Sequence, residues 1–266
     1  MDSFLKIWEQ FEMPTADILP WQLGPLHVWF KNIAAELWVA YEHIDPEQGA
    51  AEIRSVPPED VNWLRYAFQA GYHNIQFVPL LPNRPLVVKT EAPFRLLNDA
   101  ETKIYIRVPI WVKIEMVNKK KITLTELPTV TLSNTWFGSF TEGELCYWLS
   151  SGARRTIAPD AARPYMVICP INVINRADED LFVEKICLRV ANLSLFYDGI
   201  QLWSDETNVF YKGSSEFSDL EVTGVAPSEA KSAQLIASPR NPVKKSIASR
   251  TFTTIKDISG ISLFGN

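Results

Sequence analysis

The stretch from Lys103 to Val117 alternates strictly, and this constrains the fold more than any other feature of the chain. One face carries only apolar side chains: Ile104, Ile106, Val108, Ile110, Val112, Ile114 and Met116. The other face carries Lys103, Tyr105, Arg107, Pro109, Trp111, Lys113 and Glu115. A helix would scatter the apolar set around its axis, whereas a strand directs it into one core. The segment therefore predicts a long strand.

Short strand-like runs occupy most of the chain from Ile75 to Tyr211, and proline-containing turns separate many of them. Many short strands at close intervals are typical of sandwiches and barrels. We therefore predict a mainly β fold, specifically an antiparallel, jelly-roll-like β-sandwich with one or two short N-terminal helices.

The N-terminal part predicts two helices and a hairpin. Apolar side chains at helical spacing favour a short helix over Ser3–Phe11. Leu26–Ile44 has spacing that also suits one long helix, but its aromatic and β-branched residues favour a hairpin with a break at Lys31-Asn32. A second helix is expected from Ser55 to Phe68, because prolines and acids stand in its first turn and an apolar stripe follows.

Residues 226–266 differ in composition from the rest. They carry six lysines or arginines against two acids, a net charge of +4, in a segment rich in serine and threonine. We expect a β-sandwich domain over residues 1–225 and a basic C-terminal arm over residues 226–266, with a short amphipathic piece over Ile255–Phe264.

Composition bounds the function classes. The net charge of -5 argues against nucleic-acid binding, which needs a concentrated positive surface. Cys146, Cys169 and Cys187 lie in apolar runs at wide spacing, which indicates buried thiols in a reducing compartment. No signal peptide or transmembrane segment is expected. The sequence thus predicts a cytoplasmic protein. A peripheral membrane location is the alternative, because the basic arm could bind an anionic membrane surface.

Motifs that would fix a reaction are absent from the sequence. His27, His43 and His73 are far apart, and there is no Cys-x-x-Cys, P-loop, Rossmann or nucleophile-elbow pattern. We expect no metal, no cofactor and no assigned catalytic residue. Two carboxylate pairs, Glu142 with Glu144 and Asp205 with Glu206, are the remaining candidates for acid catalysis.

A binding surface is the more distinctive expectation. Trp136 and Phe137 lie in a polar, glycine-containing stretch, Trp148 follows, and Arg154-Arg155 come next. Aromatic faces stack on sugar rings, and paired guanidinium groups hold anions. The alternative is a structural role, in which these aromatic side chains close one end of the hydrophobic core.

Four motifs carry a resemblance to a known family: Pro79-Leu-Leu-Pro-Asn-Arg-Pro-Leu-Val-Val, Ile106-Arg-Val-Pro-Ile-Trp-Val, Leu132-Ser-Asn-Thr-Trp-Phe-Gly and Gly143-Glu-Leu-Cys-Tyr. In these motifs the chain resembles bacterial and archaeal proteins grouped as a domain of unknown function. The resemblance implies one β-rich architecture over most of the chain and supplies no catalytic residue. It also carries an association with membrane channels, so a channel or other membrane protein is one expected partner.

Three functional hypotheses follow. The leading one is a non-enzymatic interaction or assembly protein, which binds copies of itself or another protein through sheet edges, the aromatic loop and the C-terminal arm. The second is a carbohydrate- or anion-binding β-sandwich module that uses Trp136, Phe137, Trp148, Arg154 and Arg155. The third is an acid-catalysed hydrolase.

Overall fold

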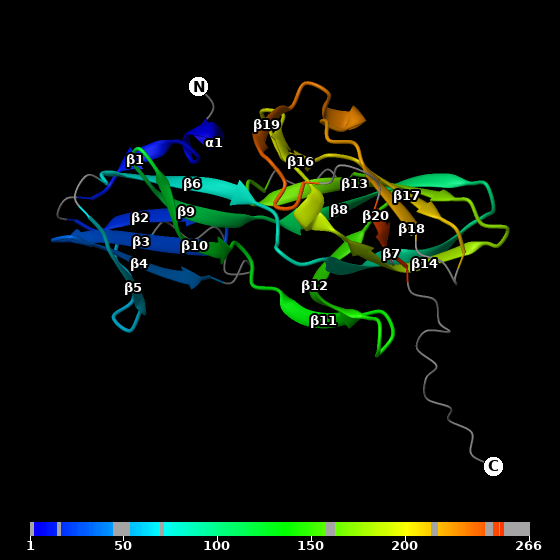
Figure 1. Cartoon of the computed structure of the whole chain (residues 1–266), viewed down its shortest axis with the longest axis horizontal. Coiled ribbons are helices and arrows are strands. Elements are labelled where there is room, and N and C mark those ends of the chain that lie inside the picture. Colours follow the sequence, from blue (N-terminus) through cyan, green and yellow to red (C-terminus); the bar gives the residue numbers. More distant parts are fainter. Residues whose placement is uncertain are drawn as a thin grey trace, which may run out of the picture. The chain divides into compact units, whose positions relative to one another are not determined.

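The computed structural model describes residues 3–14, 17–44, 54–69, 72–157, 163–213, 218–242, 247–249 and 251–252 (Figure 1). Strands dominate, so the expectation of a mainly β protein is confirmed. Among the described residues, no helix is both long enough and apolar enough to cross a membrane. The amphipathic piece expected over Ile255–Phe264 lies outside the described residues.

The chain divides into two compact units. Unit 1 comprises Met1–Leu80, Pro109–Thr131 and Ala162–Met166, and unit 2 comprises Leu81–Val108, Leu132–Ala161 and Val167–Asn266. Each unit draws on segments that are distant in sequence. The boundaries expected from the sequence, residues 1–225 and 226–266, stay a prediction.

Among its described residues, unit 1 holds two four-stranded antiparallel sheets and one helical turn, α1 (Ser3–Lys6). The first sheet has the order β1 (Gln10–Glu12), β6 (Asn74–Leu80), β9 (Trp111–Val117) and β10 (Lys121–Pro128). The second has the order β2 (Leu19–Leu23), β3 (Leu26–Ile33), β4 (Glu36–His43) and β5 (Trp63–Ala67).

Aromatic rings join the two sheets of unit 1. Phe77 of β6 is buried, and its ring centroid lies 4.1 Å from that of Trp21 on β2 and 5.7 Å from that of Phe30 on β3. Phe11 of β1 lies 5.2 Å from Phe77. The apolar faces of both sheets therefore meet around one phenylalanine.

Unit 2 holds a four-stranded and an eight-stranded sheet. The four-stranded sheet has the order β11 (Ser133–Phe137), β12 (Glu144–Ala153), β7 (Leu86–Leu96) and β14 (Leu181–Leu188), and only β12 and β7 are parallel in it. The larger sheet has the order β19 (Gln234–Ala237), β15 (Leu195–Tyr197), β16 (Leu202–Ser204), β13 (Met166–Asn175), β17 (Thr207–Tyr211), β18 (Ser218–Val222) and β20 (Ile247–Ser249), with β8 (Glu101–Pro109) also on β13. The described part of unit 2 also contains two 3-10 turns, η2 (Val190–Asn192) and η3 (Ser228–Ala230).

The alternating segment is β-structured, and all seven of its apolar side chains are buried. It is two strands rather than one, because β8 ends at Pro109 and β9 begins at Trp111. The backbone N–H of Ile110 donates to the carbonyl of Tyr165, 3.0 Å away, and its carbonyl accepts from the Thr129 hydroxyl at 2.7 Å. These bonds take Ile110 out of either strand, and Pro109 has no N–H to offer.

The hairpin expected over Leu26–Ile44 is formed by β3 and β4. Its turn falls at Ala34-Ala35 instead of Lys31-Asn32, and Ala34 adopts a positive φ of 54°. β3 therefore continues to Ile33, past the expected break, and β4 begins at Glu36.

Both helix predictions need correction. The first helix is a single turn, and Phe11 belongs to β1, where it packs on Phe77. The second helix is wrong: β5 pairs with β4, and the Lys31 ammonium lies 4.2 Å from the Trp63 ring centroid. The stretch fits two patterns: its apolar residues have helical spacing, and Trp63, Arg65 and Ala67 also alternate as in a strand. Pairing with the neighbouring strand favours the second pattern.

We expect Phe77→Ala to lower the free energy of unfolding by about 3 to 5 kcal/mol, because it empties the site where rings of both sheets meet. Urea denaturation followed by tryptophan fluorescence measures this change. Val56→Ala is the control, since Val56 is 68% exposed. A loss below about 1 kcal/mol in Phe77→Ala would contradict the described core.

Candidate functional site

The β11–β12 hairpin carries the aromatic residues singled out by the sequence. Its register is regular, with Trp136 opposite Leu145 and Phe137 opposite Glu144. Trp136 is 53% exposed, and its indole N–H donates to the carbonyl of Ser139, 3.0 Å away. Phe140 in the turn is 96% exposed, and Leu145 is 45% exposed. An apolar surface thus lies on one face of the hairpin and at its tip.

Phe137 and Trp148 belong to the opposite face. Phe137 is 3% exposed and packs with Val87, Cys146 and Cys187, and Trp148 lies against the same cluster. Side chains alternate along a strand, so Leu145, the register partner of Trp136, lies on the opposite face of the sheet from Trp148. The two tryptophans therefore do not share a binding platform.

The arginines lie beyond the other end of β12. Arg154 donates from Nε to the Glu91 carboxylate at 2.5 Å, and the Arg155 guanidinium lies 5.6 Å from the Phe94 ring centroid. Nine residues separate Leu145 from Arg154, which is about 25 to 30 Å of strand. Of the five predicted binding residues, the structure brings together only Phe137 with Trp148.

The carboxylates considered for catalysis have separate surroundings. Glu144 forms a bidentate ion pair with Arg189, in which Nη1 lies 2.9 Å from Oε2. The Asp205 carboxylate is buried and accepts from the backbone N–H of Ser194 at 3.0 Å. Glu206 accepts from the Lys103 ammonium at 2.7 Å. Each of these three carboxylates is thus held by a partner of its own.

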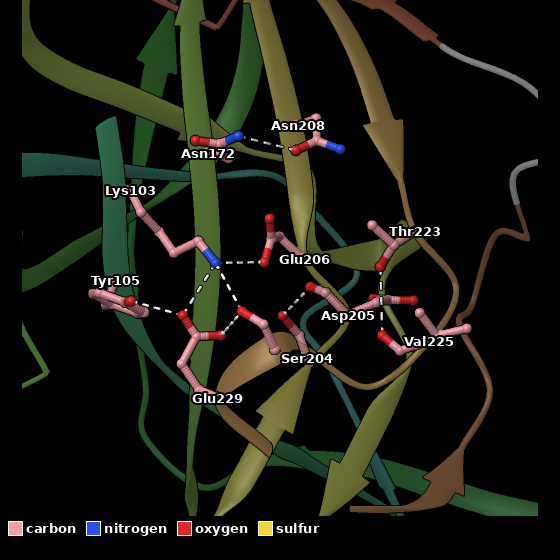
Figure 2. Close-up of polar contacts among 11 residues, drawn as sticks. Lys103, Tyr105, Asn172, Ser204, Asp205, Glu206, Asn208, Thr223, Val225 and Glu229 are labelled. Carbon is pink, nitrogen blue, oxygen red and sulfur yellow. Dashed lines mark hydrogen bonds and ion pairs between the residues drawn. The ribbon is translucent and has the colours of Figure 1, made fainter. Parts of the chain in front are cut away.

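Lys103 is the centre of a polar network on unit 2 (Figure 2). Its Nζ lies 2.7 Å from Glu206, 3.1 Å from Glu229 and 3.2 Å from the Ser228 hydroxyl, and the Tyr105 hydroxyl donates to Glu229 at 2.7 Å. Burial disfavours the charge on Lys103, but the two carboxylates outweigh it and raise its pKa. Burial and the bond to Glu229 raise the pKa of Tyr105 to about 12. The network fastens η3, the first element after residue 226, to β8.

A pair of buried thiols forms a second cluster. Ligand atoms of Glu144, Cys146 and Cys187 all lie within 4.8 Å of one another, and both cysteines are buried. The interaction between the thiols lowers the pKa of Cys146 and, together with burial, raises that of Cys187 well above its ordinary value. The expectation that all three cysteines are buried free thiols is confirmed.

A family model described as "Protein of unknown function (DUF432)" matches residues 7–256. The chain belongs to this family. The resemblance to a domain of unknown function is therefore confirmed for this DUF432 chain. No curated protein matches it, and no solved structure does.

Sequence reasoning missed the thiol pair and the Lys103 network of this DUF432 chain. Cys146 and Cys187 are 41 positions apart, and they meet only because β12 and β14 both pair with β7. Lys103 and Glu229 are joined across 126 positions. The local sequence indicated only that both cysteines lie in apolar strands. Their proximity depends on pairing between strands that are distant in sequence.

Asp205 predicts a pH dependence of stability. Burial raises the pKa of its carboxyl to about 6, against the ordinary value of 3.8, although the Ser194 hydrogen bond opposes the shift. The folded state then keeps a proton that the unfolded state has lost between about pH 4 and pH 6. Stability therefore falls as the pH rises through this range.

We expect Asp205→Asn to remove this fall, because its amide does not ionise and its oxygen still accepts from Ser194. Measured by denaturation at about pH 4 and about pH 8, the variant should gain up to about 3 kcal/mol relative to the unchanged protein at the higher pH. Parallel stability curves for the two proteins would show that Asp205 ionises normally when folded.

Proposed function

We propose that this chain is a non-enzymatic interaction and assembly protein whose principal contact is the free edge of β11, to which a second copy of the chain adds its own β11. The proposal rests on the unpaired backbone groups along this edge. β11 ends its sheet, and no described strand pairs with its other side. The alternate backbone N–H and C=O groups on that side can bond to an added strand.

β11 lacks the features by which proteins usually block an edge strand. Its residues, Ser133–Phe137, include no charge and no proline, and its register with β12 has no bulge. Other edges differ. β10 carries Lys121, Glu126 and a bulge, and residues 251–252 bond to the outer side of β14. The β11 edge is thus open to pairing where these edges are blocked.

The side chains suit a symmetric contact. Two uncharged β11 strands can pair antiparallel without placing like charges opposite each other. Trp136, Phe140 and Leu145 offer exposed apolar surface beside the added strand, and burying such side chains favours association. Assembly through β11 would therefore combine main-chain hydrogen bonds with a small apolar core.

The C-terminal arm enters this proposal as a second contact. In its described part, β19 pairs with β15 and β20 pairs with β18, so each ends the eight-stranded sheet on one side.

A jelly-roll-like sandwich, a cytoplasmic location and a membrane-channel partner remain predictions. Carbohydrate or anion binding gains no support from the separated tryptophans and the Glu91-paired Arg154, and the hydrolase hypothesis gains none from the individually paired carboxylates.

We expect the full chain to be a dimer at micromolar concentration and Trp136→Lys to be a monomer, because a lysine on an edge strand opposes strand addition and charges a face that the contact buries. Light scattering coupled to size exclusion measures both masses. Ile200→Lys is the matched control, since Ile200 is 73% exposed and lies between β15 and β16, which belong to the other sheet of the same unit.

The control should remain a dimer. A monomeric unchanged chain, or a dimer that Trp136→Lys leaves intact, would refute assembly through β11. Substitution is a sharper test than removing residues 226–266, because that deletion also removes β19 and β20 from their sheet.

A further inference from the structure

Cys146, Cys187 and Glu144 meet on one face of the four-stranded sheet. Cys187 is the register partner of Val87, and so is Trp148, which stands two residues after Cys146 and therefore on the same face. Glu144 stands two residues before Cys146 and shares that face as well. Two thiols and a carboxylate thus converge from β12 and β14 over the strand between them.

A disulfide does not suit this geometry. β7 lies between β12 and β14, so two strand spacings, about 9 Å or more, separate the backbones of the cysteines. Cysteines whose Cα atoms are more than about 7 Å apart cannot be bridged without backbone movement. The thiols approach each other while their backbones stay too far apart for a bond.

A bound cation does suit it. The ligand atoms of the three residues lie within 4.8 Å of one another. Zinc binds thiolate sulfur at about 2.3 Å and carboxylate oxygen at about 2.0 to 2.2 Å, so two ligands of one tetrahedral ion lie about 3.5 to 3.8 Å apart. Small side-chain adjustments would place all three around a single ion.

Charge selects the class of ion. Two thiolates and one carboxylate carry three negative charges, and the half-buried Arg189, which holds both oxygens of Glu144, returns one positive charge. A divalent cation makes the cluster neutral, as a buried site requires. Sulfur ligands favour a thiophilic metal over Mg²⁺ or Ca²⁺.

We propose that Cys146, Cys187 and Glu144 form a binding site for a thiophilic divalent cation such as Zn²⁺, with Arg189 orienting the carboxylate. This goes beyond the sequence, which predicts no metal site, and it does not depend on assembly through β11. Hydrogen-bonded partners of this kind commonly orient and tune metal ligands.

The test is a metal titration of the reduced, chelator-treated full chain. Co²⁺ should bind once per chain and give a thiolate-to-cobalt charge-transfer band, which Zn²⁺ then removes. Cys146→Ser and Cys187→Ser should each weaken Zn²⁺ binding at least about 100-fold, since even partners of metal ligands contribute 10- to 100-fold. Cys169→Ser is the matched control, because Cys169 is also buried but lies on β13, outside the cluster.

The unchanged protein decides the matter even if a serine variant fails to fold. A cobalt spectrum without a thiolate band would overturn the proposal. An equal loss of binding in Cys169→Ser would also overturn it, because the thiolates would then lie elsewhere.

Discussion

The hydrogen bonds of Ile110 are the constraint on which the architecture depends. Its N–H and C=O bond to Tyr165 and Thr129 outside the strand ladders, and Pro109 precedes it without an N–H. One alternating segment is thereby divided into β8, which pairs in unit 2, and β9, which lies between β6 and β10 in unit 1. The same run of buried isoleucines and valines supplies a core strand to each unit.

Unit 2 separates two kinds of surface on one hairpin. The face with Phe137, Cys146 and Trp148 packs inward, where hydrophobic burial is the stabilising term. The face with Trp136 and Leu145 remains exposed at a sheet edge without charge, proline or bulge. Exposed aromatic side chains gain by burial, and the solvated backbone groups of an open edge can pair with an added strand. Their coincidence on β11 is the reason why we propose the protein contact there.

Local patterns predicted the strands well and the long-range arrangement poorly. The period of two in Ile104–Met116 depends only on neighbouring residues, so it identified buried strand faces correctly. The stretch from Ser55 to Phe68 has helix-like capping and spacing, yet pairing with β4 makes Trp63–Ala67 a strand. The break at Ile110 depends on Tyr165, and the Cys146–Cys187 pair depends on β7. Neither partner is adjacent in sequence, so no local signal could reveal them.

The most direct test of the account is backbone hydrogen exchange in Ser133–Phe137 at low and high protein concentration. If a second copy adds its β11 to this edge, the amides that face the free side become protected at high concentration. Amides of the charged, bulged edge strand β10 should exchange at the same rate throughout. Exchange in β11 that does not change with concentration would contradict the central claim that this edge is the assembly surface.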